Sequence, residues 1–241
     1  MSARKTVAIV QSCYIPWKGY FDLINAADEF MVYDDVQYRT NDWRNRNRIK
    51  TPHGTQWLTI PIRHSSRHGQ RIDQAQVADP HWAERHWRTL AQSYARAPWF
   101  DRHRKQFEVL YGEMAGEPFL SRVNRRFMDA ICDVLGITTT ISSSAEYGIP
   151  GDGSDRVLAL CRASGAERYL SGPRGRAYLD EAAFSDSGVE IAYMDYSGYP
   201  EYPQAHPPFD HHVTILDLLF NAGPDAPRYL KGFVHATAAT A

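Results

Sequence analysis

The chain has 241 residues, of which 43% are hydrophobic and 23% charged, enough for one large or two small globular domains. No apolar run approaches the roughly 20 residues of a membrane-spanning helix, and no apolar segment typical of a signal peptide follows the basic start. Three cysteines, an odd number without metal-ligand spacing, favour a reducing compartment. We therefore expect a cytoplasmic protein without a membrane span.

The net charge is only −1, but one segment is strongly basic. Asp42 is its only acid, and its basic side chains are Arg39, Arg44, Arg46, Arg48, Lys50, Arg63, Arg67 and Arg71. This segment favours an anionic partner, although a solvated face balanced by acids elsewhere would have the same composition. No motif of a nucleic-acid-binding domain accompanies it, so we expect no nucleic-acid partner.

The hydrophobic periodicity alternates between short buried strands and amphipathic helices. The predicted strands are 6–10, 29–33, 56–62 with Pro61 at an edge or end, 138–142, 168–170 and one within 188–194. The predicted helices are 17–27, one beginning at Pro80–His81, about 100–115, 120–134 ended by Gly136, one capped by Asp152 or Ser154 and ended by Gly165, and 213–221. The segment 197–212, rich in Pro, Tyr and His, is predicted to be a long ordered loop.

Short buried strands that alternate with helices predict an α/β fold, with a mainly parallel sheet covered by helices on both faces. We expect one α/β domain over residues 1–241, with residues 80–136 as a helical subdomain or insertion. In such folds, ligands bind outside the carboxyl ends of the strands. Five strands end in polar loops, and these should share one edge of the sheet: QSCYIPWKGY, DDVQYRT, SSSAEYG, SGPRGR and DYSGYP.

Several long motifs carry a resemblance to a known family. They are QxxYxPWxGYF near the N-terminus, YDDVQY, WRNRNRIK followed by QWLTIPI, AERYLSGPRGRAYLD and ILDLLFNxGP. Together they resemble the WbqC-like protein family from about Val7 to Pro224. The resemblance implies a bacterial protein of surface-polysaccharide or specialised-metabolite biosynthesis, for which transfer of an aminoacyl group such as glycine has been proposed. The chain departs from the family pattern at Ser12, where members often have Pro, and at Val10, where they often have His.

The turn IPWKGY, between the first strand and the first helix, also looks like the HxGH turn of nucleotidyltransferase-like α/β enzymes. This similarity implies a nucleotidyltransferase-like or Rossmann-like sheet whose loops bind nucleotide phosphates. Trp17 and Tyr20 replace the two histidines. Because tyrosine carries no positive charge, binding of phosphate would fall to arginines. ATP or another nucleotide is accordingly the candidate cofactor, with Mg²⁺ as a candidate partner ion.

The first loop supplies four candidate site residues. Gly19, at a helix start, allows backbone N–H groups to approach an anion or a carbonyl. Gln11 at the strand end both donates and accepts hydrogen bonds, and with Tyr14 and Tyr20 it would position an acyl carbonyl. A tight strand-to-helix turn packed by aromatic side chains is the structural alternative.

Asp34 and Asp35 follow the second strand and should point to opposite faces, which argues against a pair that shares one proton. One would orient a substrate amine, hold Mg²⁺ or act as a base, and the other would pair with an arginine of the RNRNR segment. A purely structural Asp–Arg ion pair is the alternative.

Two further motifs suit ligand binding. In an extended RNRNR segment, Asn45 and Asn47 share one face and would bind a sugar or peptide, while Arg48 and its neighbours on the other face would grip a phosphate or carboxylate. Ser171 and Arg174 belong to a Gly-flanked basic loop that suits anion binding, with a flexible surface turn as the alternative.

The leading hypothesis is a transferase or amide-forming ligase that acts on a small molecule, with a nucleotide-linked or carrier-linked donor. Two alternatives remain: a non-catalytic module that binds a nucleotide sugar or a partner enzyme, and an acyltransferase that uses Cys13 as its nucleophile. His206, His211 and His212 are candidates for a base that activates Cys13 or for metal ligands. Their spacing does not indicate a metal centre.

Overall fold

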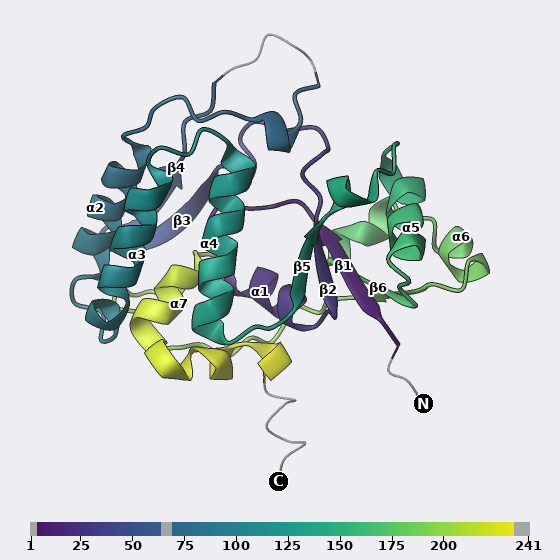
Figure 1. Ribbon diagram of the computed structural model, residues 1–241. Coiled ribbons are helices and arrows are strands. Elements are labelled where there is room, and N and C mark those ends of the chain that lie inside the picture. The colour runs from purple at the N-terminus through teal and green to yellow at the C-terminus, as the bar shows by residue number, and fades with distance from the viewer. Residues whose placement is uncertain (1–3, 64–68, 234–241) are drawn as a thin grey trace.

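The computed structural model describes residues 4–63 and 69–233, and its main feature is a five-stranded parallel sheet (Figure 1). The strands lie in the order β5-β2-β1-β6-β7, and every neighbouring pair is parallel. Their bounds are Thr6–Val10 for β1, Glu29–Val32 for β2, Thr140–Ser143 for β5, Arg168–Ser171 for β6 and Glu190–Tyr193 for β7. The five predicted strands of the sheet are therefore confirmed, as is the α/β class.

β1 is the central strand, and the chain leaves it in two directions. β2 and β5 follow on one side, while β6 and β7 follow on the other. The strand order therefore reverses between β1 and β6, and an open parallel sheet has a crevice at such a point outside the carboxyl ends of its strands. Because all five strands are parallel, the five polar loops do begin at one edge of the sheet.

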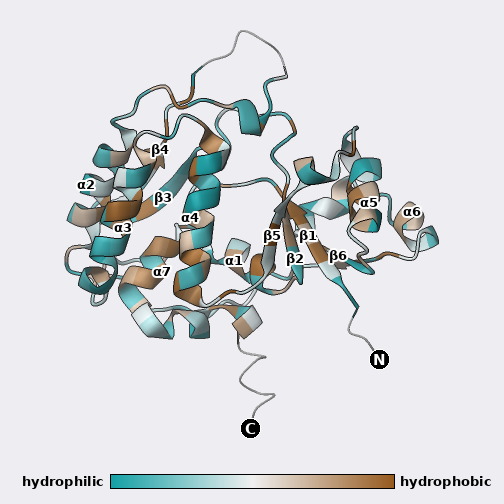
Figure 2. Cartoon of the chain, in the orientation of Figure 1, coloured by the Kyte–Doolittle hydropathy of each residue, from teal (hydrophilic) through white to brown (hydrophobic). Residues whose placement is uncertain are grey.

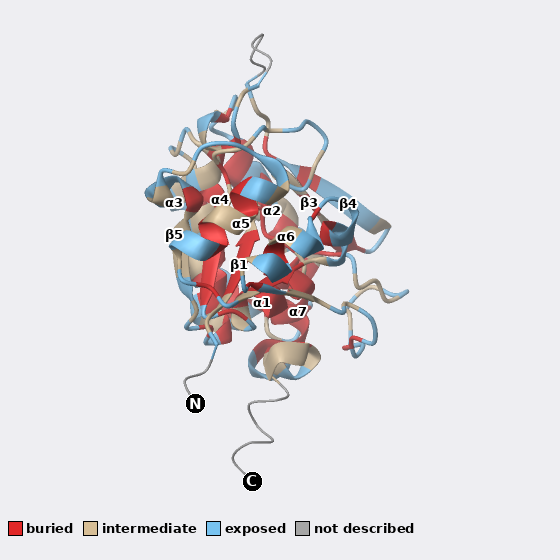
Figure 3. Ribbon diagram, turned by 90° about the vertical axis from the view of Figure 1, so that its right-hand side faces the viewer, coloured by how far each residue is buried: buried red, intermediate tan, exposed pale blue. Residues whose placement is uncertain are grey.

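Helices cover both faces of the sheet, as predicted. Alternate residues of β1 point to opposite faces: Val7 and Ile9 pack with α5 (Gly153–Ala163) and α6 (Glu181–Asp186), whereas Ala8 belongs to the cluster that includes α1 (Lys18–Asn25) and α4 (Leu120–Leu135). Figure 2 shows the hydrophobic colour concentrated on the strands between these two helical layers. Figure 3 shows the central strands as buried behind α5 and α6.

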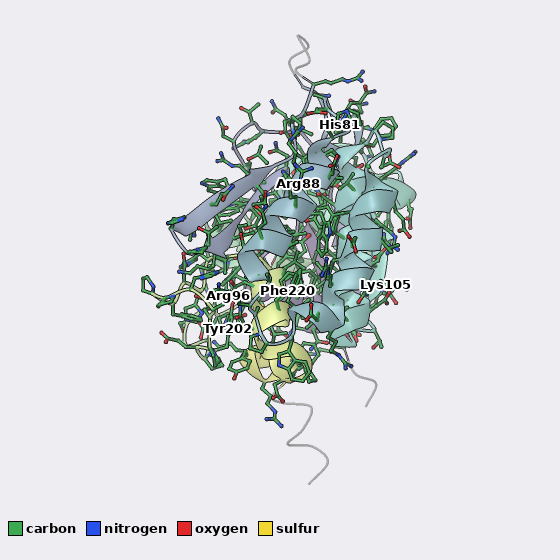
Figure 4. All side chains as sticks on the ribbon, turned by 90° about the vertical axis from the view of Figure 1, so that its left-hand side faces the viewer. His81, Arg88, Arg96, Lys105, Tyr202 and Phe220 are labelled. Carbon is green, nitrogen blue, oxygen red and sulfur yellow. The ribbon has the colours of Figure 1, made fainter. Side chains whose placement is uncertain are left out.

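The larger helical layer contains α2 (Trp82–Tyr94), α3 (Phe100–Met114), α4 and α7 (Ile215–Ala222). Its aromatic centre is Phe220 of α7, which contacts Tyr94 of α2 and Phe100 and Phe107 of α3 (Figure 4). The three helices predicted within 80–136 are confirmed as elements. They share one hydrophobic cluster with α7 and with the sheet.

Between β2 and α2 the chain forms an antiparallel hairpin of β3 (Arg46–Thr51) and β4 (Gly54–Thr59), which the sequence pattern did not indicate as a pair. The predicted strand 56–62 was placed too late, because β4 ends before Pro61, a residue that cannot donate to a ladder. The short helix α6 was also missed. Its six residues hold too few turns to show a helical period.

In the described chain no helix or strand lies between β7 and α7, so the predicted long loop is confirmed. We call residues 195–213 the strap. Tyr199 donates a hydrogen bond to Asp22 on α1, and Tyr202, labelled in Figure 4, donates to Asp217 on α7. The strap is therefore fastened to two helices, α1 and α7. Among the described helices, none is both long and apolar enough to cross a membrane.

Candidate functional site

A cavity of about 810 Å³ lies at the carboxyl ends of β1, β2 and β6. Its volume falls within the usual range for a small-molecule site, and its position is the switch point of the sheet. Its walls come from the loops after these three strands, from α1, from the segment after β4, from the start of α5 and from one strap residue. The residues that carry its chemistry are Gln11, Trp17, Tyr20, Asp35, Arg39, Asp42, Arg44, Arg71, Asp152, Ser171, Arg174 and Tyr196.

Positive charge in the cavity is only partly compensated. Arg71 forms a bidentate pair with Asp73, at 2.9 and 2.7 Å. For Arg39 and Arg174, by contrast, no carboxylate within the described residues lies within 4.0 Å of the guanidinium. Guanidinium groups without a protein partner at a strand-end crevice favour a ligand with phosphate or carboxylate groups.

Arg44 ties the floor of the cavity to the loop after β1. Its Nη1 donates to the carbonyl oxygens of Gln11 at 3.1 Å and of Ser12 at 3.2 Å, and approaches the Sγ of Cys13 at 2.9 Å. The Arg44 Nε is buried and has no hydrogen-bond partner among the described residues. It lies 3.6 Å from a carboxylate oxygen of Asp42, so Arg44 fixes the loop and its charge is partly offset by Asp42.

Gln11 and Tyr20, two predicted site residues, both line the cavity. The Tyr20 hydroxyl donates to the Gln11 carbonyl oxygen at 3.1 Å, and burial raises the pKa of Tyr20 far enough to keep it a neutral phenol. Gln11 is only partly buried, so its amide can reach a ligand.

Gly19 lies beside the cavity, and its contacts explain why glycine stands there. A Cβ on Gly19 would lie 2.4 Å from the Trp17 ring, so the missing side chain lets this indole lie against the start of α1. Trp17 also contacts Tyr196 of the strap, with ring centroids 5.1 Å apart. The predicted role of Gly19 in binding an anion stays a prediction, because its packing against Trp17 already requires glycine.

Asp34 and Asp35 contact different parts of the protein, in line with their predicted opposite directions. Asp34 is buried and accepts the backbone N–H of Ser12 at 2.8 Å, while its Oδ2 has no partner among the described residues. Burial raises the pKa of Asp34.

Asp35 lines the cavity, accepts the Ser144 hydroxyl at 2.6 Å and pairs with Arg156 of α5. The expected pairing with an arginine of the RNRNR segment is therefore wrong for Asp35. The α5 helix, more than a hundred residues later in the chain, supplies the partner.

Ser171, the last residue of β6, and Arg174, in the 3-10 helix Pro173–Ala177 that follows, both line the cavity. This turn is tightly packed, because a Cβ on Gly175 would lie 2.3 Å from the Ser171 hydroxyl oxygen. Arg176 of the same turn instead places its guanidinium 3.9 Å from the Tyr193 ring centre and is not among the cavity residues. The turn therefore presents one arginine, Arg174, to the cavity.

Besides Gly19 and Asp34, four more predicted site residues lie outside the cavity walls. Tyr14 is fully buried, with its hydroxyl 2.6 Å from that of Tyr111. The amide nitrogens of Asn45 and Asn47 are also buried and donate hydrogen bonds to backbone carbonyl oxygens. Arg48 lies 5.8 Å from the Trp57 ring centre, on the hairpin. Their binding or catalytic roles stay predictions. The contacts described here already explain the presence of these side chains by packing and hydrogen bonding.

The sequence predicts an anion contact for Arg44, but it indicates no such role for Arg39, Arg71 or Asp152, which also line the cavity. The sequence shows the basic segment, but strand alternation alone cannot show which of its arginines points into the cavity. Arg44 precedes β3 and reaches β1, whereas Arg48 lies within β3 and faces the other way. Asp152 follows Gly151 at the start of α5, and this Gly-Asp-Gly segment was interpreted only as a helix cap.

Cys13 is buried beneath the loop and is not one of the cavity residues. Burial raises its pKa to about 11, and nearby Arg44 only partly offsets this effect. Cys13 is therefore a thiol at neutral pH, the less reactive form. His206 contacts the Ser93 carbonyl at 2.8 Å. Among the described residues no group of three or more His, Cys, Asp or Glu could hold a metal ion.

Fold and cavity together define a doubly wound α/β protein with an arginine-lined crevice at its switch point. The comparisons with known proteins give the family: residues 11–229 match the WbqC-like protein family, so the chain belongs to it. It is similar to Uncharacterized protein Rv1507c of Mycobacterium tuberculosis (strain ATCC 25618 / H37Rv), with 44% identity over 227 residues, covering 94% of this chain and 98% of that protein. No solved structure matches it significantly.

Proposed function

We propose that the protein is a group transferase or ligase whose cavity binds the phosphate part of an activated acyl donor. One observation carries the proposal: guanidinium groups of Arg39, Arg44 and Arg174 surround a cavity of about 810 Å³ at the switch point of a parallel sheet. A nucleotide or another phosphate-bearing carrier has both the charge and the size for this cavity. The acyl group would be an aminoacyl group of the glycyl type or a related one.

In the proposed reaction, an amine or hydroxyl of a sugar or small metabolite attacks the acyl carbonyl carbon. A C–N or C–O bond forms, the bond from the carbonyl carbon to the donor phosphate oxygen breaks, and the acceptor's proton passes to the departing phosphate. Arg44 and Arg174 stabilise the departing phosphate. The Gln11 amide positions the acyl group, and Asp35 orients the acceptor's amine. We place this reaction in the cytoplasm, in surface-polysaccharide or specialised-metabolite biosynthesis.

The test compares two arginines of one turn. Arg174→Ala removes the guanidinium that lines the cavity, and Arg176→Ala removes the one that packs on Tyr193. Calorimetric titration with ATP and with an aminoacyl adenylate analogue should show affinity at least about tenfold lower for Arg174→Ala, a typical effect of losing one charge-assisted contact. Arg176→Ala should bind like the wild type. Equal affinity of all three proteins for every ligand would reject the phosphate site.

A second candidate is a binding module for a nucleotide-linked sugar, and the state of the carboxylates favours it. Asp35 is engaged by Arg156 and Ser144, and Asp34 lies below the cavity, so neither stands ready as a base. Incubation with an aminoacyl adenylate and candidate amines, followed by mass spectrometry, separates the two. Ligand binding without any acylated product would support the module.

A further inference from the structure

A second candidate binding surface lies on the β3–β4 hairpin, and we call Trp43, Arg46, Arg48 and Trp57 the hairpin platform. Trp43 and Trp57 are 38% and 43% exposed, and only two other large hydrophobic side chains of the described chain are exposed. Their ring centres lie 5.2 Å apart with the planes at 41°. Two indoles held side by side in solvent are unusual, because such surface normally becomes buried unless it binds something.

The hairpin register explains how the platform forms. Arg48 lies directly opposite Trp57, and Arg46 is its diagonal neighbour, so all three side chains share one face. The opposite face carries Asn47 and Leu58, which are buried. Figure 3 shows most of β4 as exposed. The platform is therefore the outer face of a hairpin whose inner face is fixed to the core.

The platform is positively charged. The Arg46 guanidinium lies 4.5 Å from the Trp57 ring centre, within cation–π distance, and no carboxylate of the described residues lies within 4.0 Å of it. Arg48 has only a distant carboxylate, Asp210 of the strap at 3.9 Å. An occupant must therefore combine a surface that stacks on indole with a negative charge.

The platform also adjoins the cavity wall along the chain. Trp43 lies between Asp42 and Arg44, both of which line the cavity. Its carbonyl oxygen accepts the backbone N–H of Tyr14 at 3.2 Å, so the Trp43 backbone is joined to the loop after β1. The backbone that carries Trp43 is therefore also the backbone that carries two residues of the cavity wall.

We infer that the hairpin platform binds a saccharide that carries carboxylate or phosphate groups, and that this saccharide is the acceptor. Sugar rings present an apolar C–H face suited to an indole, and the anionic groups would pair with Arg46 and Arg48. Two indoles cover a short stretch of chain, which suits one or two sugar rings better than the long basic track that single-stranded nucleic acid needs. The role as acceptor rests on the proposed function, whereas the binding site does not.

The experiment measures tryptophan fluorescence during titration with an oligosaccharide of galacturonic acid. Its neutral galactose counterpart and a single-stranded oligodeoxynucleotide serve as competing probes. The acidic oligosaccharide should bind, Trp57→Ala should weaken it at least about tenfold, and Trp57→Phe should retain most of the affinity. Arg46→Gln should weaken the acidic oligosaccharide and leave the neutral one unchanged. Thermal unfolding of each variant verifies that the hairpin is folded.

Two results would overturn the inference: equal binding of the acidic and neutral oligosaccharides, or binding of the oligonucleotide alone. Absence of all binding would overturn it as well. Arg174→Ala distinguishes this inference from the proposed function, because it should lose the nucleotide and keep the saccharide. Trp57→Ala should do the reverse, so each site can fail separately.

Discussion

Asn47 offers a sharp test of how the floor of the cavity is held. Ile15, in the loop after β1, has a φ of +36°, a conformation that costs a β-branched residue about 1–3 kcal/mol. The Asn47 amide nitrogen donates to the Tyr14 carbonyl at 3.2 Å and to the Ile15 carbonyl at 2.8 Å, on either side of the strained bond. We therefore expect Asn47 to fasten a turn that the chain would otherwise relax.

Replacing Asn47 by Ala leaves two buried carbonyls without this donor. At about 1–3 kcal/mol for each orphaned group, and with the longer bond at the lower end, the free energy of unfolding should fall by about 2–5 kcal/mol. In a protein of this size the melting temperature should fall by about 5–15 °C. Urea denaturation measures the loss, and an unchanged m-value shows that the unfolded state is unaltered.

Asn45→Ala is the matched control, because Asn45 is also a buried amide on the inner side of the same segment. It donates one hydrogen bond, to the Ile60 carbonyl at 2.8 Å, and its Oδ1 has no partner in the described chain. Its loss should cost about 1–2 kcal/mol. If Asn47→Ala were no more costly than Asn45→Ala, the turn would not depend on Asn47 and the reasoning would be refuted.

Three further predictions follow from buried and tightly packed side chains. Asp35→Asn should destabilise the protein by about 3–5 kcal/mol, because it leaves the buried guanidinium of Arg156 uncompensated, and adding Arg156→Met should recover part of the loss in the same urea assay. Burial lowers the pKa of His86 from 6.5 to about 4, so between these two pH values the unfolded chain binds more protons than the folded one. The free energy of unfolding should therefore fall as the pH drops from 6.5 to 4. His86→Gln should flatten this pH dependence, and an unaltered pH dependence would contradict the buried, neutral state of His86. Gly19→Ala should displace the Trp17 ring and shift its fluorescence, which an unchanged emission spectrum would disprove.

The sheet could be predicted from sequence because its strands are short apolar runs bounded by polar loops. Val7-Ala8-Ile9-Val10 is apolar throughout, as a strand buried on both faces must be, and the two hydrophobic clusters divide it as alternation requires. The helix ends predicted at Gly136 and Gly165 are confirmed, because both glycines have the positive φ that is common just after a helix. The hairpin could not be predicted because β3 is mostly polar, so its sequence resembles that of a charged loop.

The candidate site was harder to predict, because it depends on contacts between distant segments. Sequence placed Gln11, Tyr20, Asp35, Ser171 and Arg174 at strand ends, and topology alone brought those strand ends together. No local pattern could show that Asp35 pairs with a residue of α5. Nor could it show that Tyr14 points into the helical layer, since the Tyr111 that meets it lies 97 positions away.

The segment Arg44–Arg48 shows why a basic run need not be a single binding surface. Strand alternation sends its asparagines inward, where Asn47 holds the strained turn, and sends Arg46 and Arg48 outward to the hairpin platform. Arg44 precedes the regular strand and is free of that alternation, so it can turn back to β1 and line the cavity. One stretch of five residues thus links the cavity floor, the core and the outer face. A change in the hairpin register by one residue would exchange the inner and outer sets and remove the platform and the fastening of the turn together.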